Sequence, residues 1–425
     1  MLTIILLAVM GLFMAINVPI AVAIGVSSVV GVLLTSDVSM IVVAQKVFSS
    51  NDSFPLLAIP FFMLAGELMT SGGVSKRLVD FASSLVGHYR GGLGSIAIVA
   101  SAFFAALSGS NAATVAAIGT IMIPAMQKKG YDEGYTAATL AAAGTTGMVI
   151  PPSILMILYG VVVGVPITDL FIAGLIPGLL MATSMVVLNW FLCRNRNYAR
   201  EPRCAFSGIW KSFKDAVWAL LTPVIILGSI YGGIATPTEA AAMAALYGLI
   251  IGFFVYKELK IKDLPLIILR SALSTSIVMF VMSTAGLLAW VITVNEIPQE
   301  LAKTFADFSK NQAVYLLLVN GLLLFTGCFI NAAAQIPIFA PILYPAAAVL
   351  GIDPVLFGII MTVNLCIGTI TPPLGVDLFV ASTISKVPLE KIAVNIWPYL
   401  LVLVIDLLII TYYPPLSLFL LVVFK

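Results

Sequence analysis

Long apolar runs without a charged residue dominate this sequence. They cover 1–36, 91–127, 134–168 and 313–352, and each exceeds the roughly 20 residues that a helix needs to cross a bilayer. The first run is interrupted by Asn17-Val18-Pro19, which leaves open whether it forms one long tilted helix or two short ones. The pattern predicts an all-α polytopic membrane protein.

Composition strengthens this prediction. Hydrophobic residues make up 61% of the 425 residues and charged residues only 9%, whereas an ordinary soluble domain has roughly 25% charged residues. A formal net charge of +2 is not the strongly basic balance of a nucleic-acid-binding protein. Soluble enzymes, nucleic-acid binders and secreted scaffolds are therefore excluded, and the partner that the composition indicates is the lipid bilayer.

The sequence repeats itself at a spacing of about 220 residues. The segment GMVIPPS at 147–153 returns as GTITPPL at 368–374, and Asn-Ala-Ala occurs at 111–113 and again at 331–333. Matches in the same register are Gly66 with Gly286, Pro124 with Pro345, Asp132 with Asp353 and Pro177 with Pro398. Such agreement indicates two homologous halves, 1–193 and 216–425, joined by a connector, 194–215.

The charged residues predict opposite membrane orientations for the two halves. Loops rich in Lys and Arg stay in the cytoplasm, and the connector holds six of the 21 basic residues. The first-half loop at Lys128-Lys129 is basic, whereas its counterpart around Asp353 is acidic. Conversely, Lys386 and Lys391 mark a basic loop whose counterpart, 165–169, has no basic residue. This alternation is typical of inverted-topology repeats.

Two amphipathic segments, 74–90 and 297–310, occupy equivalent places in the two halves. In both, apolar residues recur at helical spacing and the charged residues occupy other faces. Amphipathic helices of this kind lie along the membrane interface. We therefore expect two arm helices that clasp another part of the assembly, with plain surface connectors as the alternative.

A re-entrant helical hairpin is expected after each arm, at 93–128 and 312–350. Each segment has two apolar runs that are short for full spans, divided by Leu-Ser-Gly-Ser-Asn at 107–111 and by Gly-Cys-Phe-Ile-Asn at 327–331. A tip inside the membrane must have its backbone groups satisfied by protein, water or ions. Ordinary helix packing at glycine and serine is the alternative.

Proline pairs are expected to break one helix in each half, within 134–164 and 354–385. Pro151-Pro152 and Pro372-Pro373 stand midway along apolar segments, where a proline removes a hydrogen bond and clashes with the preceding turn. The freed carbonyls suit Na⁺, and helix N-termini suit an anionic substrate group. A structural kink is the alternative, but a hairpin and a broken helix in each half are typical of inverted-repeat transporters.

Other chemistry is sparse in the sequence. There is no GxxxxGK[ST] motif for nucleotide hydrolysis, and no nucleophile–base pair or metal cluster that a membrane enzyme would need. The carboxylates in apolar surroundings are Glu67, Glu239, Asp377 and Asp406. Proton-driven carriers usually contain chains of buried carboxylates or histidines, so Na⁺ is the favoured coupling ion. The paired hairpins and breaks argue against a passive channel.

Several motifs resemble the large membrane (M) subunit of tripartite ATP-independent periplasmic (TRAP) transporters. The most specific is PVIILGSIYGGIATPTEAAA at 223–242. Three others are similar to that family: NVPIAVAIG at 17–25, SGSNAATVAAIG at 108–119 and GTTGMVIPPS at 144–153. The resemblance runs along nearly the whole chain.

This resemblance implies a fold, partners and a driving ion. The fold would be the elevator-type architecture of ion-coupled carriers, in the bacterial inner membrane. The partners would be a small four-helix membrane subunit and a periplasmic substrate-binding protein, and Na⁺ would drive import of an organic acid. Family substrates include C4-dicarboxylates, sialic acid and other sugar acids, and the resemblance leans towards the sialic acid branch. The alternative is a single-component Na⁺/carboxylate symporter.

The resemblance also implies about two Na⁺ sites per chain, each between a hairpin tip and a helix break. Residues expected at the first site are Ser108, Ser110, Asn111, Gly147, Val149 and Pro151. Those expected at the second are Gly327, Asn331, Gly368, Thr369 and Thr371. Beside the breaks, Ser153, Asn364 and Asp377 are expected to line the substrate site, with packing or capping as the alternative role.

Overall fold

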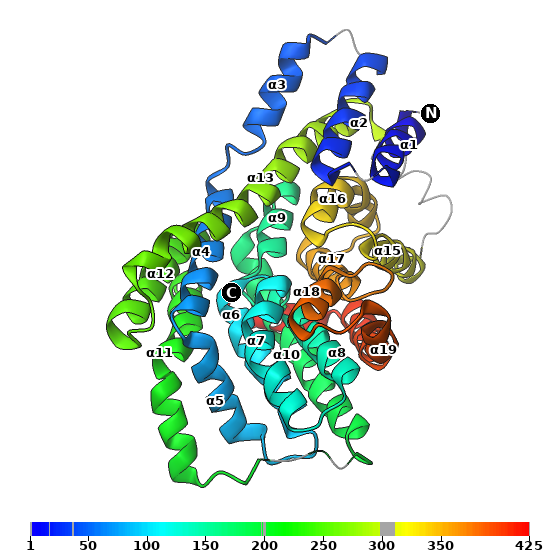
Figure 1. Cartoon of the computed structure of the whole chain (residues 1–425). Helices are drawn as coiled ribbons and strands as arrows, with labels where there is room; N and C mark the ends of the chain where they lie inside the picture. The colour runs from blue at the N-terminus through cyan, green and yellow to red at the C-terminus, as the bar shows by residue number, and fades with distance from the viewer. Residues whose placement is uncertain are drawn as a thin grey trace.

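The computed structural model describes residues 2–16, 18–35, 38–196, 198, 201–297 and 311–424, and all regular structure in these ranges is helical (Figure 1). The helices of the first half are α1 (Leu2–Ala15), α2 (Ile20–Thr35), α3 (Met40–Ser49), α4 (Ala58–Ser71), α5 (Val74–Val86), α6 (Gly92–Ser108), α7 (Asn111–Lys128), α8 (Glu133–Gly144), α9 (Ile154–Val163) and α10 (Ile167–Leu192). Those of the second half are α11 (Phe206–Tyr231), α12 (Pro237–Ile250), α13 (Leu264–Val294), α15 (Gln312–Gly327), α16 (Ala332–Val349), α17 (Pro354–Gly368), α18 (Val376–Ser385), α19 (Leu389–Tyr412) and α20 (Pro415–Phe424). Four short elements are the 3₁₀ helices η1 (Phe54–Leu57), η2 (Thr145–Met148) and η4 (Ile261–Asp263) and the π-helix η3 (Ile251–Val255).

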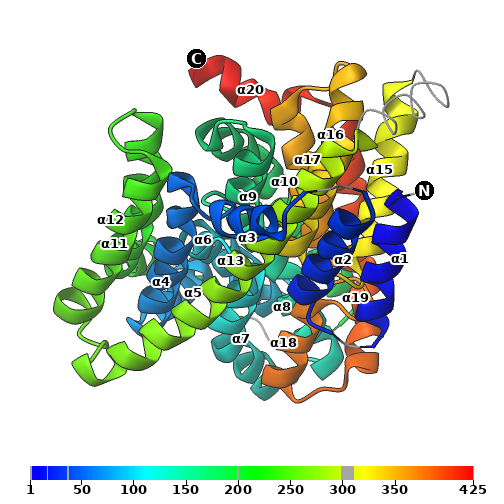
Figure 2. The same ribbon diagram turned by 90° about the horizontal axis from the view of Figure 1, so that it is seen from above.

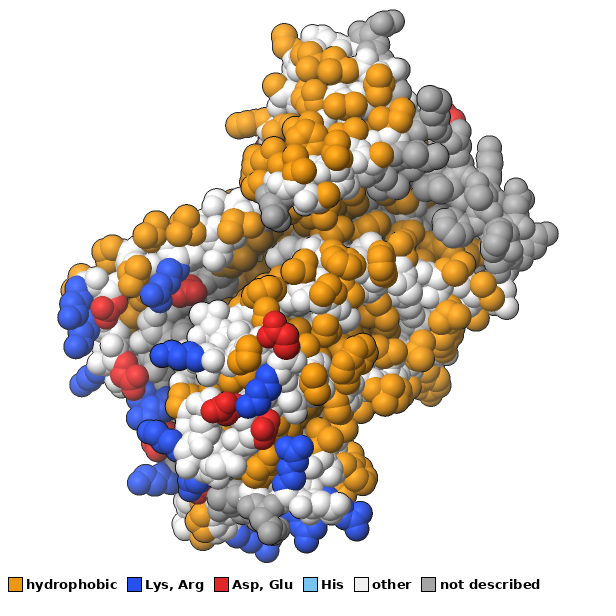
Figure 3. Space-filling model, turned by 45° about the vertical axis from the view of Figure 1, so that its right-hand side comes forward, with side chains coloured by type: hydrophobic (Ala, Val, Ile, Leu, Met, Phe, Trp, Pro, Cys, Tyr) orange, Lys and Arg blue, Asp and Glu red, His pale blue; other side chains and the backbone are white. Residues whose placement is uncertain are grey.

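The predicted membrane class is confirmed. Within the described ranges, 7 helical segments are long and apolar enough to cross a membrane, namely Phe54–Ser71, Ile167–Leu192, Phe206–Tyr231, Pro237–Val255, Ile261–Val294, Ala332–Val349 and Leu389–Tyr412. Apolar side chains cover much of the face in Figure 3, while Lys and Arg gather towards one end. The protein is therefore a multi-pass membrane protein.

The first apolar run forms two helices rather than one. α1 ends before Pro19, and α2 begins directly after it, because proline fits the start of a helix but not its interior. The two helices pack together: the Ser27 hydroxyl donates to the Leu6 carbonyl (2.7 Å). A Cβ on Gly31 would lie only 2.8 Å from the Leu6 side chain.

The helices form two groups, which α13 connects. At one side α12 packs on α4 and α11 packs on α5, and from there α13 runs across the molecule to α2 and α16 (Figures 1 and 2). In the second group the halves of the chain interlock, since α18 packs on α7 and α8, and α16 packs on α9. The hairpin and break segments of both halves therefore meet in one place.

The first predicted arm contains α5, whose apolar face is buried against α6 and α11. From its outer face, Arg77 donates to the Glu258 carboxylate (2.8 Å) and lies over the Tyr256 ring (3.7 Å from the ring centroid). These contacts tie the arm to the segment that follows η3. The second predicted arm, 297–310, lies outside the described residues except for its first residue.

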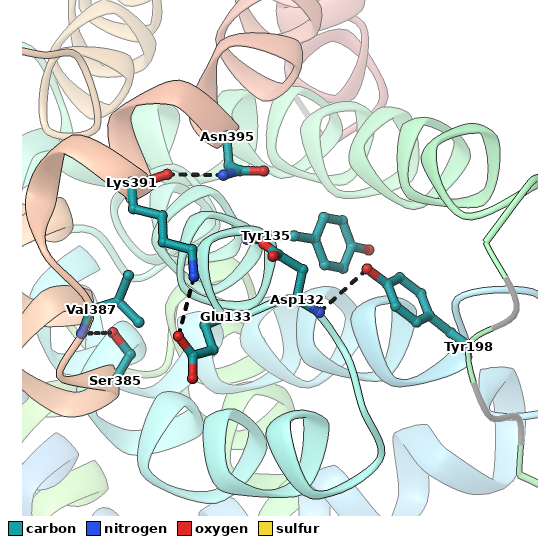
Figure 4. Close-up of polar contacts among 8 residues, drawn as sticks. All are labelled: Asp132, Glu133, Tyr135, Tyr198, Ser385, Val387, Lys391 and Asn395. Atoms are coloured by element: carbon teal, nitrogen blue, oxygen red, sulfur yellow. Dashed lines mark hydrogen bonds and ion pairs between the residues drawn. The ribbon is translucent and has the colours of Figure 1, made fainter.

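Two loops from different halves meet at one end of the molecule (Figure 4). Asp132 caps α8 by accepting a hydrogen bond from the Tyr135 amide (2.8 Å). Lys391, in the first turn of α19, forms an ion pair with Glu133 (3.2 Å). The basic loops that follow α7 and α18 therefore lie at the same end.

Asn189, near the end of α10, is a buried polar hub. Its amide donates to the Gly91 carbonyl (3.0 Å) and the Ser95 hydroxyl (2.8 Å), and its oxygen accepts a bond from the Tyr135 hydroxyl. Since Gly91 precedes α6 and Tyr135 lies on α8, one side chain joins three helices of the group that carries the hairpins.

We expect Asn189→Ala to lower the free energy of unfolding by about 2–4 kcal/mol, because several buried polar groups lose a partner. Thermal unfolding of the purified protein in detergent measures this loss. The matched control is Asn395→Ala, because the Asn395 amide makes one exposed bond to the Lys391 carbonyl (2.9 Å; Figure 4). Equal losses in the two variants would contradict the role of Asn189 as a hub.

Candidate ion and substrate site

The tip of the first hairpin is a tight turn of small polar residues. α6 ends at Ser108, Gly109 has a φ of +61°, and Ser110 caps α7. Glycine suits the middle of this turn because a left-handed φ strains residues that carry a Cβ. The Ser108 hydroxyl lies 2.9 Å from Thr114 Oγ1, which in turn donates to the Ser110 carbonyl (2.9 Å). The tip thus carries several hydroxyl and carbonyl oxygens in a buried place.

The first helix break lies where the proline pair was predicted to put it. After α8, the hydroxyls of Thr145 and Thr146 donate to carbonyls of the preceding turn (2.7 and 2.8 Å). η2 then leads to Pro151-Pro152, and Ser153 caps α9 by accepting a hydrogen bond from the Met156 amide (3.4 Å). The Ser153 side chain, expected at the substrate site, therefore has the capping role that was named as the alternative.

The first tip and the first break touch each other through their backbones. A Cβ added to Gly147 would lie 2.6 Å from the Ser110 carbonyl oxygen and 2.7 Å from Thr114 Oγ1. The Ile154 amide donates to the Gly109 carbonyl (3.3 Å). Only glycine allows this approach at 147, and the contact brings carbonyl oxygens of the tip beside the unwound helix.

The tip of the second hairpin is built from a different set of residues. Asn331 caps α16 with its side chain. The buried Gln335 side chain holds the turn, since its amide donates to the Ile330 carbonyl (2.9 Å) and its oxygen accepts from the Thr326 hydroxyl (2.8 Å). The Gln335 amide side chain therefore fixes the second tip, whereas the hydroxyls of Ser108 and Thr114 fix the first.

The second tip also meets the second break at glycine backbone. A Cβ on Gly368 would lie 2.7 Å from the Gly327 Cα, and one on Gly327 would lie 2.8 Å from the Gly368 Cα. The Thr371 hydroxyl donates back to the Ile367 carbonyl (2.8 Å). Each half thus presses a hairpin tip against a broken helix at a position where a side chain does not fit.

One polar cluster joins the two halves. The amide of Asn111, the first residue of α7, donates to the Thr369 hydroxyl at the end of α17 (3.0 Å). The Thr369 hydroxyl also lies 2.6 Å from the carboxylate of Asp377, in the first turn of α18. All three residues are buried. Asn111, expected at the first ion site, therefore faces the second break.

The remaining predicted site residues lie as follows. Val149 and Pro151 are buried in the first break. Asn364, expected to line the substrate site, is buried in α17, where its amide donates to the Asn320 side chain (2.7 Å) and the Ile360 carbonyl (3.2 Å). The structure thus groups the tip and break residues of each half, and it places Asn364 in a separate polar pair.

Sequence reasoning missed the side chains that hold the tips, Thr114 and Gln335. They stand 221 residues apart, as do Gly147 and Gly368. This common spacing is the signal that could have found them, although threonine and glutamine are not similar enough to be noticed as a match.

The tips and breaks hold no ion pair in the described part of the chain, although the Asp377 carboxylate lies at the second break. The ion pairs in the described part of the chain join Arg77 with Glu258, Lys129 with Glu201 and Lys391 with Glu133, and none of these lies at a tip or a break. Carbonyls, hydroxyls and amide oxygens are ligands for alkali cations rather than groups for acid–base chemistry.

Comparison with known proteins identifies a family. Residues 7–416 match the family described as "Tripartite ATP-independent periplasmic transporter, DctM component". The chain is 43% identical to the "C4-dicarboxylate TRAP transporter large permease protein DctM" of Pseudomonas aeruginosa, over 93% of either chain. It is 39% identical to the "Sialic acid TRAP transporter large permease protein SiaM" of Vibrio cholerae, over 91% of either chain.

A solved structure shares the fold. The Alcanivorax borkumensis YdaH transporter superposes with a TM-score of 0.64, at 16% sequence identity and over 89% of each chain. At this identity the likeness concerns the helical architecture alone.

Proposed function

Because the chain belongs to the DctM component family of tripartite ATP-independent periplasmic (TRAP) transporters, we propose that it imports a small organic acid with Na⁺ as the coupling ion. It is a large permease subunit, not an enzyme. In this proposal a periplasmic binding protein delivers the substrate, a small four-helix membrane subunit completes the transporter, and the complex lies in the bacterial inner membrane.

The observation that carries the proposal is the pair of tip–break contacts, Gly147 against Ser110 and Gly327 against Gly368. Unwound backbone inside a membrane needs partners for its free carbonyls, and Na⁺ is a suitable one. We assign one ion to the first contact and one to the second. Asn111, which was expected at the first Na⁺ site, is left out of that assignment, because its side-chain amide donates a hydrogen bond to Thr369 of the other half.

Elevator motion is supported by the space between the two helix groups. A groove of about 540 Å³ with almost wholly apolar lining lies among α5, α6, α10 and α11. Its lining side chains include Leu78, Phe103, Leu179 and Leu220. The apolar lining of this groove favours sliding of the hairpin group against α4, α5 and α11–α13.

The substrate in this proposal is an organic acid such as a C4-dicarboxylate, sialic acid or another sugar acid. The names of two relatives give different substrates, so membership of the family does not identify which acid is transported. Ser153, Asn364 and Asp377 are buried and hydrogen-bonded within the protein. Contact between these residues and substrate therefore requires the tips to move.

The proposal is tested by uptake into proteoliposomes. We expect no uptake by this chain alone, and uptake when the small subunit, the loaded binding protein and an inward Na⁺ gradient are all supplied. Replacing Na⁺ by choline is the control for ion coupling. Uptake by the isolated chain would instead support a single-component Na⁺/carboxylate symporter, and uptake without Na⁺ would refute Na⁺ coupling.

A further inference from the structure

The groove among α5, α6, α10 and α11 offers nothing to water. Its one polar lining residue is Thr183, whose hydroxyl donates within α10 to the Leu179 and Leu180 carbonyls (2.8 and 2.9 Å). A water molecule needs two to four polar partners, so apolar cavities stay dry. Because α10 and α11 are both long and apolar enough to span the membrane, hydrocarbon is the material available to fill the groove.

The groove is about as long as one leaflet of a bilayer. On α10 its lining runs from Leu175 to Val187, which is about 18 Å at 1.5 Å per residue. The hydrocarbon of one leaflet is about 15 Å thick, half of the bilayer core. The inner end reaches Ala106 and Ile150, which stand just before the first tip and the first break. The groove therefore has the length of a single acyl chain.

A tryptophan and an arginine stand at the outer end of this groove. Leu179, Thr183 and Val187 line it at intervals of four residues, and Trp190 continues the same face of α10. The Arg194 guanidinium carbon lies 5.9 Å from the centroid of the Trp190 ring. Arg194 belongs to none of the ion pairs in the described part of the chain. Since tryptophan is enriched at membrane–water interfaces, this pair marks the level of the lipid headgroups.

We propose that the groove binds an anionic phospholipid of the cytoplasmic leaflet, with one acyl chain against α6, α10 and α11 and the phosphate at Arg194. The guanidinium group is suited to phosphate because it can donate two parallel hydrogen bonds. Arg194 begins the basic connector, and loops rich in Lys and Arg stay in the cytoplasm, where they attract anionic lipids. No acidic side chain lines the groove to oppose the headgroup.

This lipid site is independent of the proposed Na⁺ coupling. It uses none of the residues assigned to the ions or to the substrate, and its test measures lipid binding rather than uptake. The other occupant of suitable shape is a helix of the small membrane subunit, and the experiment below distinguishes the two.

The test is photocrosslinking of the permease with its small subunit in nanodiscs of phosphatidylcholine. The probe is phosphatidylglycerol with a diazirine near the end of one acyl chain, kept at a constant small fraction of the lipid. We expect crosslinks at the inner end of the groove, around Ala106, Ile150 and Leu175, mapped by mass spectrometry. Replacing phosphatidylcholine by unlabelled phosphatidylglycerol should suppress these crosslinks several-fold. Labelling of the exposed Leu401 on α19 should stay constant.

Val187→Trp tests the acyl-chain part of the site. Val187 lines the groove and is 54% exposed, so a tryptophan there narrows the groove without entering the protein core. We expect the groove crosslinks to fall several-fold. The matched control is Val394→Trp on α19, where the native valine is 73% exposed and does not line the groove. This control should crosslink like the native protein.

Arg194→Gln tests the headgroup part of the site. Without the guanidinium charge, phosphatidylglycerol should compete no better than phosphatidylcholine. Arg203→Gln is the control, because Arg203 lies in the same connector but outside α10 and α11. It should keep the native preference. An equal loss in both variants would show that the connector attracts anionic lipid by its overall charge, and would overturn the assignment of the phosphate to Arg194.

Two further outcomes would overturn the proposal as a whole. If the groove is labelled no more than Leu401, or if Val187→Trp leaves the crosslinks unchanged, no acyl chain occupies it. If the crosslinks appear with the isolated chain and vanish when the small subunit is present, a helix of that subunit fills the groove. Neither outcome bears on Na⁺-driven uptake, which is measured separately.

Discussion

Gly368→Ala is expected to weaken Na⁺-driven uptake more than almost any other glycine-to-alanine substitution in this protein. The new Cβ would lie 2.7 Å from the Gly327 Cα and 3.2 Å from its carbonyl oxygen. These are backbone atoms, which cannot rotate away as a side chain can. Overpacking of this kind costs about 1–3 kcal/mol, which corresponds to an apparent Na⁺ affinity about five- to 140-fold weaker.

The measurement is the Na⁺ concentration that gives half-maximal uptake in proteoliposomes containing the complete transporter. Gly321→Ala is the matched control: Gly321 lies on α15, the helix that ends at Gly327, and among the described residues nothing stands within 4 Å of its added Cβ. The control should transport normally, since alanine is the better helix former. A native Na⁺ response in Gly368→Ala would show that the close approach of the two glycines is not needed for ion binding.

Gly147→Ala is expected to have a comparable effect through the other half. Its Cβ would lie 2.6 Å from the Ser110 carbonyl oxygen, so the first tip has to withdraw from the break. Because that carbonyl is proposed to bind Na⁺, we expect a lower apparent Na⁺ affinity, again about tenfold or more if overpacking costs at least 1.4 kcal/mol.

The control for this variant is Gly119→Ala in α7. An added Cβ there meets two isoleucine side chains at 3.5 Å, which is ordinary contact distance. Size-exclusion profiles and expression levels of both variants distinguish a local effect from misfolding. If Gly119→Ala and Gly147→Ala lose uptake to the same extent, the loss reflects hairpin packing in general and not the proposed ion site.

The helix breaks were the easiest part of the site to predict. Two adjacent prolines inside an apolar segment interrupt a helix in any surroundings, and α8 and α17 do end shortly before them. The all-helical membrane class was equally accessible, because the length of the charge-free runs and the thickness of the bilayer suffice to infer it.

At the tip of the first hairpin, residue identity is a poor guide to structural equivalence. Asn111 and Asn331 match as letters at a spacing of 220, but the residues that cap the two helices are Ser110 and Asn331, which are 221 apart. Serine and asparagine are nearly equivalent as helix caps. The cap position depends on the backbone conformation, so an identical letter is a weaker guide to it than an equivalent hydrogen bond.

The sequence by itself determined that the chain is a membrane protein, that its halves share a pattern, and that each half has a polar interruption and a proline break. These features depend on local composition and on residues near one another along the chain. Only the tertiary structure decided that Gly327 meets Gly368 and that Asn111 reaches Thr369 and Asp377 in the other half. Such contacts join residues up to 258 positions apart, and they depend on how α7, α17 and α18 pack, which no local pattern specifies.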